Sequence, residues 1–168
     1  MKIIKVTNIE KFADKILPKQ PQKNKIIVES ILKNVKKNGD SAIRKYEKKF
    51  SGANISSLRL SQREIKNAYS KISKNELAAL RLAKNRLEKT ESEIKSLLKN
   101  KTINHDGVKI SKKFTSIQSV GCYVPGGLAR YPSSAIMSVV PAKVAGVKRI
   151  VVVSPPNSDG QIDPLTIV

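Results

Sequence analysis

The sequence predicts an α/β fold, in which a helix-rich N-terminal half is followed by the first βαβ unit of an incomplete, Rossmann-like parallel sheet. Two observations support this prediction. Apolar residues recur at helical spacing through most of the N-terminal half, and the spacing then changes to that of extended strands. From residue 119 onward, a strand pattern, a glycine-rich loop, a helix pattern and an apolar strand pattern follow one another.

The first elements are expected to be helices. Residues 1–21 are predicted to form an arm, with a short helix near residues 9–17 that two prolines then interrupt. Apolar spacing predicts a helix over residues 22–38. Gly39 is expected to end this helix, because glycine accepts the left-handed conformation beyond a helix terminus. Asp40 is then expected to cap a further helix.

Residues 22–118 are predicted to form a helical α/β portion with a long helix and a hairpin. A short strand is predicted at residues 58–60. Two capping-box patterns each predict the start of a helix: Ser61 with Glu64, and Ser73 with Glu76. The second of these helices extends to about Leu98, and we interpret its stripe of leucine and isoleucine as part of a core.

Extended segments follow the long helix. Asp106-Gly107 predicts a hairpin between residues 102–105 and 108–114. Residues 119–124 are predicted to form a strand, residues 133–146 a helix, and residues 148–154 an apolar strand of the kind that is buried on both faces of a parallel sheet.

The end of the sequence predicts an incomplete domain over residues 119–168. Asp163 and Pro164 resemble an N-cap and the first position of a helix. Only five residues of this apolar helix precede the end of the sequence, and a lone βαβ unit leaves its sheet edges uncovered. We therefore expect the chain to be a truncated part of a larger fold, or to need a partner that completes it.

Composition narrows the class of protein. The formal charge is +20, and 29 of the 33 basic residues precede Ser119. Such a charge attracts nucleic acid, but the lysines are scattered among helical apolar positions, so we favour solvated helix faces. One cysteine, no signal-peptide pattern and no long apolar run favour a cytoplasmic protein without a membrane span.

The glycine-rich loop carries the most informative chemistry. Gly126 and Gly127 follow a predicted strand and permit close approach of a ligand to the backbone. The helix predicted at residues 133–146 would present unpaired N–H groups to a phosphate or pyrophosphate. Taken alone, a Pro-Gly-Gly turn is a weak signal, because it is not the glycine fingerprint of dinucleotide-binding folds.

Residues 120–137, together with residues 140–146 and Ser154-Pro155-Pro156, resemble the nucleotide-binding segment of histidinol dehydrogenases. The resemblance implies oxidation of L-histidinol to L-histidine through an aldehyde in two NAD-dependent steps, by a zinc-dependent homodimer. It implies that residues 119–168 begin an NAD-binding domain. It also implies that Tyr123 contacts NAD, with Gly126 and Gly127 shaping the same pocket.

The catalytic centre of that family is expected to lie outside this chain. The family binds zinc through two His, a Gln and an Asp, and it uses a Glu-His pair for proton transfer, all farther along its sequence. This chain has one histidine, His105, and one cysteine, Cys122, which we interpret as a turn residue and a small buried side chain. No catalytic or metal-binding residue is therefore predicted here. We expect an N-terminal fragment that is inactive alone; the alternatives are a basic nucleic-acid-binding protein and a non-catalytic assembly partner.

Overall fold

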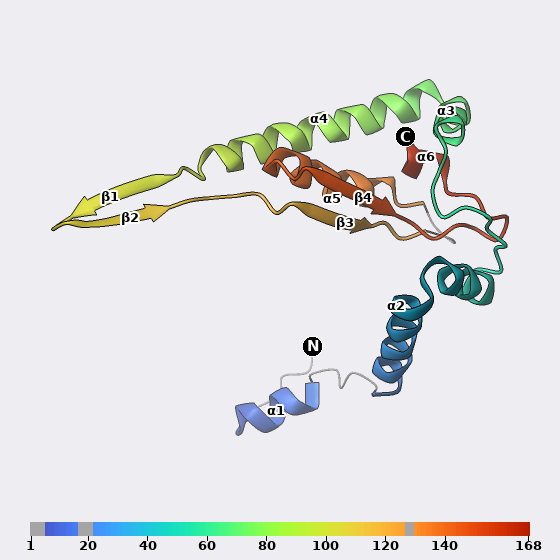
Figure 1. Cartoon of the computed structure of the whole chain (residues 1–168), viewed down its shortest axis with the longest axis horizontal. Coiled ribbons are helices and arrows are strands. Elements are labelled where there is room, and N and C mark those ends of the chain that lie inside the picture. Colours follow the sequence, from blue (N-terminus) through green and yellow to red (C-terminus); the bar gives the residue numbers. More distant parts are fainter. Residues whose placement is uncertain (1–5, 17–21, 127–129) are drawn as a thin grey trace. The chain divides into compact units, whose positions relative to one another are not determined.

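The computed structural model describes residues 6–16, 22–126 and 130–168. Its α-carbon contacts divide the chain into two compact units, residues 1–43 and 44–168, and each is described here by itself. Figure 1 shows the order of helices and strands along the chain.

The parts of the first unit that the structure describes, residues 6–16 and 22–43, are mostly helical, as predicted. Helix α1 spans Ile9–Ile16, and the Asn8 side chain accepts a hydrogen bond from the backbone N–H of Lys11 at its start. Helix α2 spans Gln22–Phe50 and continues into the second unit. It is interrupted at Gly39, whose φ of 53° and ψ of −135° are not helical. These values confirm the predicted helix break at Gly39. Glycine adopts this backbone conformation more readily than residues with a Cβ, which explains why the break occurs at this residue.

The two capping boxes are also confirmed. Helix α3 spans Gln62–Ser70 and helix α4 spans Lys74–Ser96, and in each the N-cap serine and the glutamate three residues later bond reciprocally. The strand predicted at residues 58–60 is wrong. The Ser57 hydroxyl bonds to both the N–H and the carbonyl of Arg59, so this segment forms a local turn.

These caps predict a stability loss in acid. Hydrogen bonds from the Ser61 hydroxyl and backbone N–H hold the pKa of Glu64 below its ordinary value. Because the folded-state pKa is depressed, this contribution is present above about pH 4.5 and is lost as the pH falls through the folded-state value. We expect the unfolding temperature of Glu64→Gln to fall less than that of the wild type between pH 6 and pH 3.

Thermal unfolding followed by circular dichroism at several pH values would measure this difference. Glu93→Gln is the matched control, because it removes a carboxylate from the exposed surface of α4 without touching a cap. Equal pH dependence in Glu64→Gln and the wild type would contradict the assignment of the acid loss to the cap.

The predicted hairpin is present. Strands β1, Lys101–His105, and β2, Val108–Lys112, pair antiparallel, and Figure 1 shows them leading away from the end of α4. Asp106 and Gly107 at the turn both have positive φ values, 47° and 81°, as the type I′ form of a two-residue hairpin turn requires. All ten strand residues are exposed, so the hairpin adds no core within the described residues.

The βαβ unit positions the candidate site. Strands β3, Ser119–Tyr123, and β4, Arg149–Val153, are parallel, and the backbone N–H of Val124 extends their ladder by donating to the carbonyl of Val153. Helix α5, Pro132–Ala145, connects them and packs on both strands. It ends at the C-cap Gly146, which has a left-handed conformation with a φ of 90°. Buried side chains of this unit include Cys122, Val124 and Val140.

Helix α4 lies against α5, as Figure 1 shows, and two polar contacts define their relative direction. Near the C-terminal ends, the Lys95 Nζ donates to the carbonyl of Val144 over 2.7 Å. Near the N-terminal ends, Glu76 faces Arg130, which lies just before α5. The two helices therefore run in the same direction.

Two expectations about burial are not met. Val151, Val152 and Val153 of β4 are 42–51% exposed, because within the described residues β4 pairs only with β3. The apolar stripe of α4 is half-buried near its N-terminus, whereas Ile94 is 50% exposed.

A short helix α6, Pro164–Ile167, follows β4 and is capped by Asp163, as predicted. None of the described helices is long and apolar enough to cross a membrane.

Candidate functional site

Tyr123 is the last residue of β3 and lies at the carboxyl edge of the parallel pair. Its register partner is Val153, the last residue of β4. Tyr123 is 67% exposed, whereas the preceding residue, Cys122, is only 4% exposed. Since successive side chains on a strand point to opposite faces, the burial of Cys122 leaves the Tyr123 phenol on the open face. Tyr123 is therefore not a core tyrosine within this unit, and the interpretation of Cys122 as a small buried side chain is confirmed.

Gly126 lies where the chain leaves β3 and passes the segment that leaves β4. A Cβ on Gly126 would be 2.8 Å from the carbonyl oxygen of Pro155 and 2.9 Å from the Ser154 Oγ. Gly126 also lines a hollow of about 200 Å³, together with Arg130 and Asp163. Only glycine permits this approach between the two segments. Gly127, the other predicted glycine of the site, lies outside the described residues.

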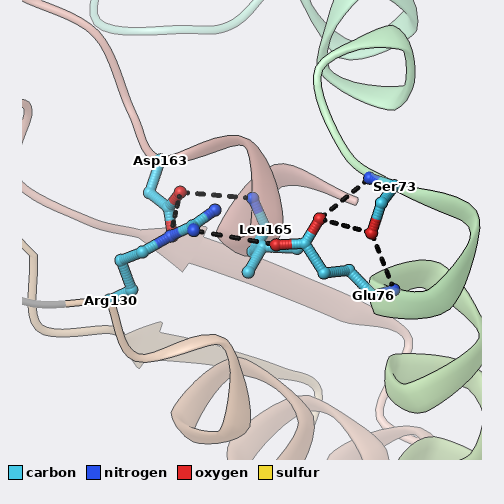
Figure 2. Close-up of polar contacts among 5 residues, drawn as sticks. All are labelled: Ser73, Glu76, Arg130, Asp163 and Leu165. Atoms are coloured by element: carbon cyan, nitrogen blue, oxygen red, sulfur yellow. Dashed lines mark hydrogen bonds and ion pairs between the residues drawn. The ribbon is translucent and has the colours of Figure 1, made fainter.

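Arg130 joins three segments of the second unit, as Figure 2 shows. Its Nε donates to the Oδ1 of Asp163 over 3.1 Å, and its Nη1 lies 3.7 Å from the Oε1 of Glu76. The same Oδ1 accepts a hydrogen bond from the Leu165 N–H, which caps α6. The Oδ2 of Asp163 is buried without a hydrogen-bond partner among the described residues. Arg130 thus connects the start of α5 to the N-termini of α4 and α6.

Glu76 is held in its charged form by its surroundings. Its Oε2 accepts hydrogen bonds of 2.8 Å from both the backbone N–H and the hydroxyl of Ser73. These bonds, the backbone one first, lower the pKa of Glu76, and the charge of Arg130 lowers it further. Glu76 therefore remains anionic near neutral pH and can pair with Arg130 while it caps α4.

The described residues do not fit a zinc site. No group of three or more His, Cys, Asp or Glu side chains in the described ranges gathers closely enough to hold a metal ion. His105 ends β1 next to the hairpin turn, and its imidazole is 81% exposed and lies 3.3 Å from the carboxylate of Asp106. His105 is therefore the last strand residue before the turn rather than one of the two turn residues, which are Asp106 and Gly107.

The Arg130 contacts were not foreseen from the sequence. The patterns identified Glu76 as part of a capping box and Asp163 as an N-cap, and both assignments are correct. No local pattern indicates that one arginine reaches both carboxylates. The sequence offers one indirect signal for this cluster: Glu76 and Asp163 each cap a helix, and a capping carboxylate is held at a fixed place where a cation can pair with it.

Comparison with solved structures first identifies the class of protein to which the fold belongs. The chain is similar to the crystal structure of histidinol dehydrogenase from Elizabethkingia anophelis, with a TM-score of 0.81 and 29% identity. This match covers 90% of the present chain and 34% of that chain. The fold is therefore an α/β fold that is shared with an oxidoreductase.

Comparison of sequences defines the family. A family model described as histidinol dehydrogenase matches residues 17–168, which is most of the chain. The chain belongs to the histidinol dehydrogenase family. It is 38% identical to the histidinol dehydrogenase of Clostridium acetobutylicum over 95% of its own length and 37% of that protein's length. It is 44% identical to the enzyme of Methanococcus maripaludis over 84% of its own length and 33% of that protein's length.

The chain thus spans about a third of the length of these relatives, as an N-terminal portion would. The relatives named here lend no support to a nucleic-acid-binding protein. None of the charged side chains that the structure describes is buried. This agrees with the interpretation of the lysines as residues of solvated helix faces.

Proposed function

We propose that this chain forms the cofactor side of a histidinol dehydrogenase, which oxidises L-histidinol to L-histidine through the aldehyde and reduces two NAD. In this proposal, β3, α5 and β4 are the first βαβ unit of a Rossmann-like sheet. The remaining strands, the zinc ligands and the proton-transfer groups belong to sequence beyond these residues. The complete enzyme is proposed to be a homodimer.

The observation that carries the proposal is the exposed Tyr123 at the carboxyl edge of the parallel strands. Ligands of open α/β sheets bind outside the carboxyl ends of the strands. Tyr123 offers a ring face for packing and a phenol O–H that can donate one hydrogen bond. Gly126, at the same edge, brings the two strand-end segments together. These residues fit a cofactor that presents a flat ring and polar groups, as NAD does.

Zinc has no place in the steps assigned to this chain, since the described residues offer no ligand set for it. The work of this chain is to bind and orient NAD. NAD, if bound at this edge, would accept hydride first from the alcohol and then from the hydrate that water forms with the aldehyde, so that the second oxidation yields the carboxylate. We expect the 168-residue chain alone to form no NADH, with or without added zinc.

NADH absorbance tests this proposal in two samples. The protein that carries this chain together with the rest of a histidinol dehydrogenase is expected to form two NADH per L-histidinol. The 168 residues alone are expected to form none. NADH formation by the isolated chain would contradict the assignment of the chemistry to other residues. Absence of histidinol-dependent NADH in the longer protein would refute the proposed function.

A further inference from the structure

The guanidinium of Arg130 is committed to two carboxylates at the start of α5. Asp163 is the closer partner, at 3.1 Å, and its side chain is only 23% exposed. Glu76 lies at 3.7 Å and is 40% exposed. One positive charge therefore faces two negative charges, so the cluster has no net attraction for an anion such as a cofactor phosphate. This balance favours a structural use of Arg130 over direct contact with an anionic ligand.

The position of Arg130 in the chain shows which segment its ion pairs with Asp163 and Glu76 hold in place. It lies four residues beyond Gly126 and two residues before Pro132, the first residue of α5. Its carboxylate partners are themselves fixed, because Glu76 is bonded to Ser73 and Asp163 caps α6. The N-cap residue of α5, Tyr131, makes no side-chain hydrogen bond to the helix. Arg130 therefore provides a polar anchor where α5 lacks a cap of its own.

We propose that Arg130 is a positioning residue, which holds the N-terminus of α5 beside the Pro125-Gly126 segment that lines the same hollow, in the arrangement that binds the dinucleotide. It acts through Asp163 and Glu76 and does not touch the cofactor. The inference rests on the proposed function for the identity of the ligand. The anchoring of α5 itself follows from contacts within the second unit.

Conservative variants separate anchoring from direct anion binding. Arg130→Gln removes the guanidinium. Asp163→Asn and Glu76→Gln keep the helix caps, because Asn caps as well as Asp and Gln replaces Glu in a capping box. They remove the negative charge that faces Arg130 and so weaken its pairing. Lys95→Gln is the matched control, since it removes one positive charge and one contact to α5 at the opposite end of the helix.

The KM for NAD is the first measurement, made on the longer protein that carries this chain. We expect Arg130→Gln and Asp163→Asn to raise it roughly threefold to fivefold, the range for a partly exposed ion pair, while kcat changes less. Glu76→Gln is expected to raise the KM less, because the Arg130–Glu76 distance of 3.7 Å is longer than the Arg130–Asp163 distance of 3.1 Å. The double variant Arg130→Gln/Asp163→Asn should be no worse than Arg130→Gln, and Lys95→Gln should match the wild type.

A lower or unchanged KM in Asp163→Asn, beside a raised KM in Arg130→Gln, would identify Arg130 as a direct anion ligand and overturn the proposal. Unchanged KM values in all variants would also overturn it.

Amide hydrogen exchange on the 168-residue chain tests the anchor without activity. Exchange at residues 136–139, the first amides of α5 with hydrogen-bond partners inside the helix, is expected to be faster in Arg130→Gln and Asp163→Asn than in Lys95→Gln and the wild type. Equal exchange in all four would refute the anchor. If the longer protein does not use NAD, the proposed function fails, and hydrogen exchange still decides the anchoring role.

Discussion

Gly126→Ala is expected to lower the free energy of unfolding by about 1–3 kcal/mol, the usual range for forcing an extra methyl group into a packed site. The new Cβ would be 2.8 Å from the Pro155 carbonyl oxygen and 2.9 Å from the Ser154 Oγ. The hydroxyl of Ser154 can rotate away, but the carbonyl belongs to the backbone and cannot. The segments that follow β3 and β4 must therefore separate.

Gly121→Ala is the matched control, because Gly121 lies on β3 five residues earlier in the same unit. Its Cβ would meet no other atom within 4 Å. We expect this variant to be neutral or stabilised by up to about 1 kcal/mol, since alanine reduces the entropy of the unfolded chain. Urea unfolding of the two variants and the wild type measures the difference. Similar stabilities for Gly126→Ala and Gly121→Ala would contradict the close packing.

The same geometry changes the interpretation of Gly126. From the sequence, this glycine was expected to let a ligand approach the backbone. In the structure, the atoms closest to its missing side chain belong to Ser154 and Pro155. Gly126 thus fixes the junction of the two strand ends first, and it shapes the proposed cofactor pocket through that junction.

Elements with local chemical causes were predictable from the sequence. The Ser73–Glu76 box, the Asp106-Gly107 turn and the helix break at Gly39 each depend on groups a few residues apart, so their patterns are readable. The strand pattern at residues 58–60 failed for a local reason as well. The Ser57 hydroxyl satisfies the backbone of Arg59, and this competes with strand pairing.

Contacts between distant segments were not predictable. The apolar sequence of β4 correctly predicted a parallel strand, but the exposure of Val153 depends on which segments lie beside it. Likewise, Arg130, Glu76 and Asp163 come together only because α4 and α5 run in the same direction and α6 begins nearby. Such juxtapositions follow from tertiary packing, which no local pattern in a single sequence reports.

Tyr123→Ala, in the longer protein that carries this chain, is expected to raise the KM for NAD about 5-fold to 140-fold. The phenol can contribute about 0.5–1.5 kcal/mol through ring packing and a similar amount through one hydrogen bond, and each 1.4 kcal/mol is a factor of ten. Tyr123→Phe keeps the ring and loses only the hydroxyl, so it is expected to raise the KM about 2-fold to 10-fold.

In the 168-residue chain, the same substitutions should leave stability nearly unchanged, because a side chain that is 67% exposed contributes little packing within this unit. Tyr69→Ala is the matched control, since Tyr69 is also exposed but lies on α3 rather than at the strand edge. Titration of NADH by its own fluorescence gives the affinity independently of turnover. An unchanged KM and an unchanged NADH affinity in Tyr123→Ala would contradict the proposal that the cofactor binds at this edge of the sheet. A raised KM in both Tyr123→Ala and Tyr123→Phe, with Tyr69→Ala unchanged, would place ring and hydroxyl alike in the cofactor contact.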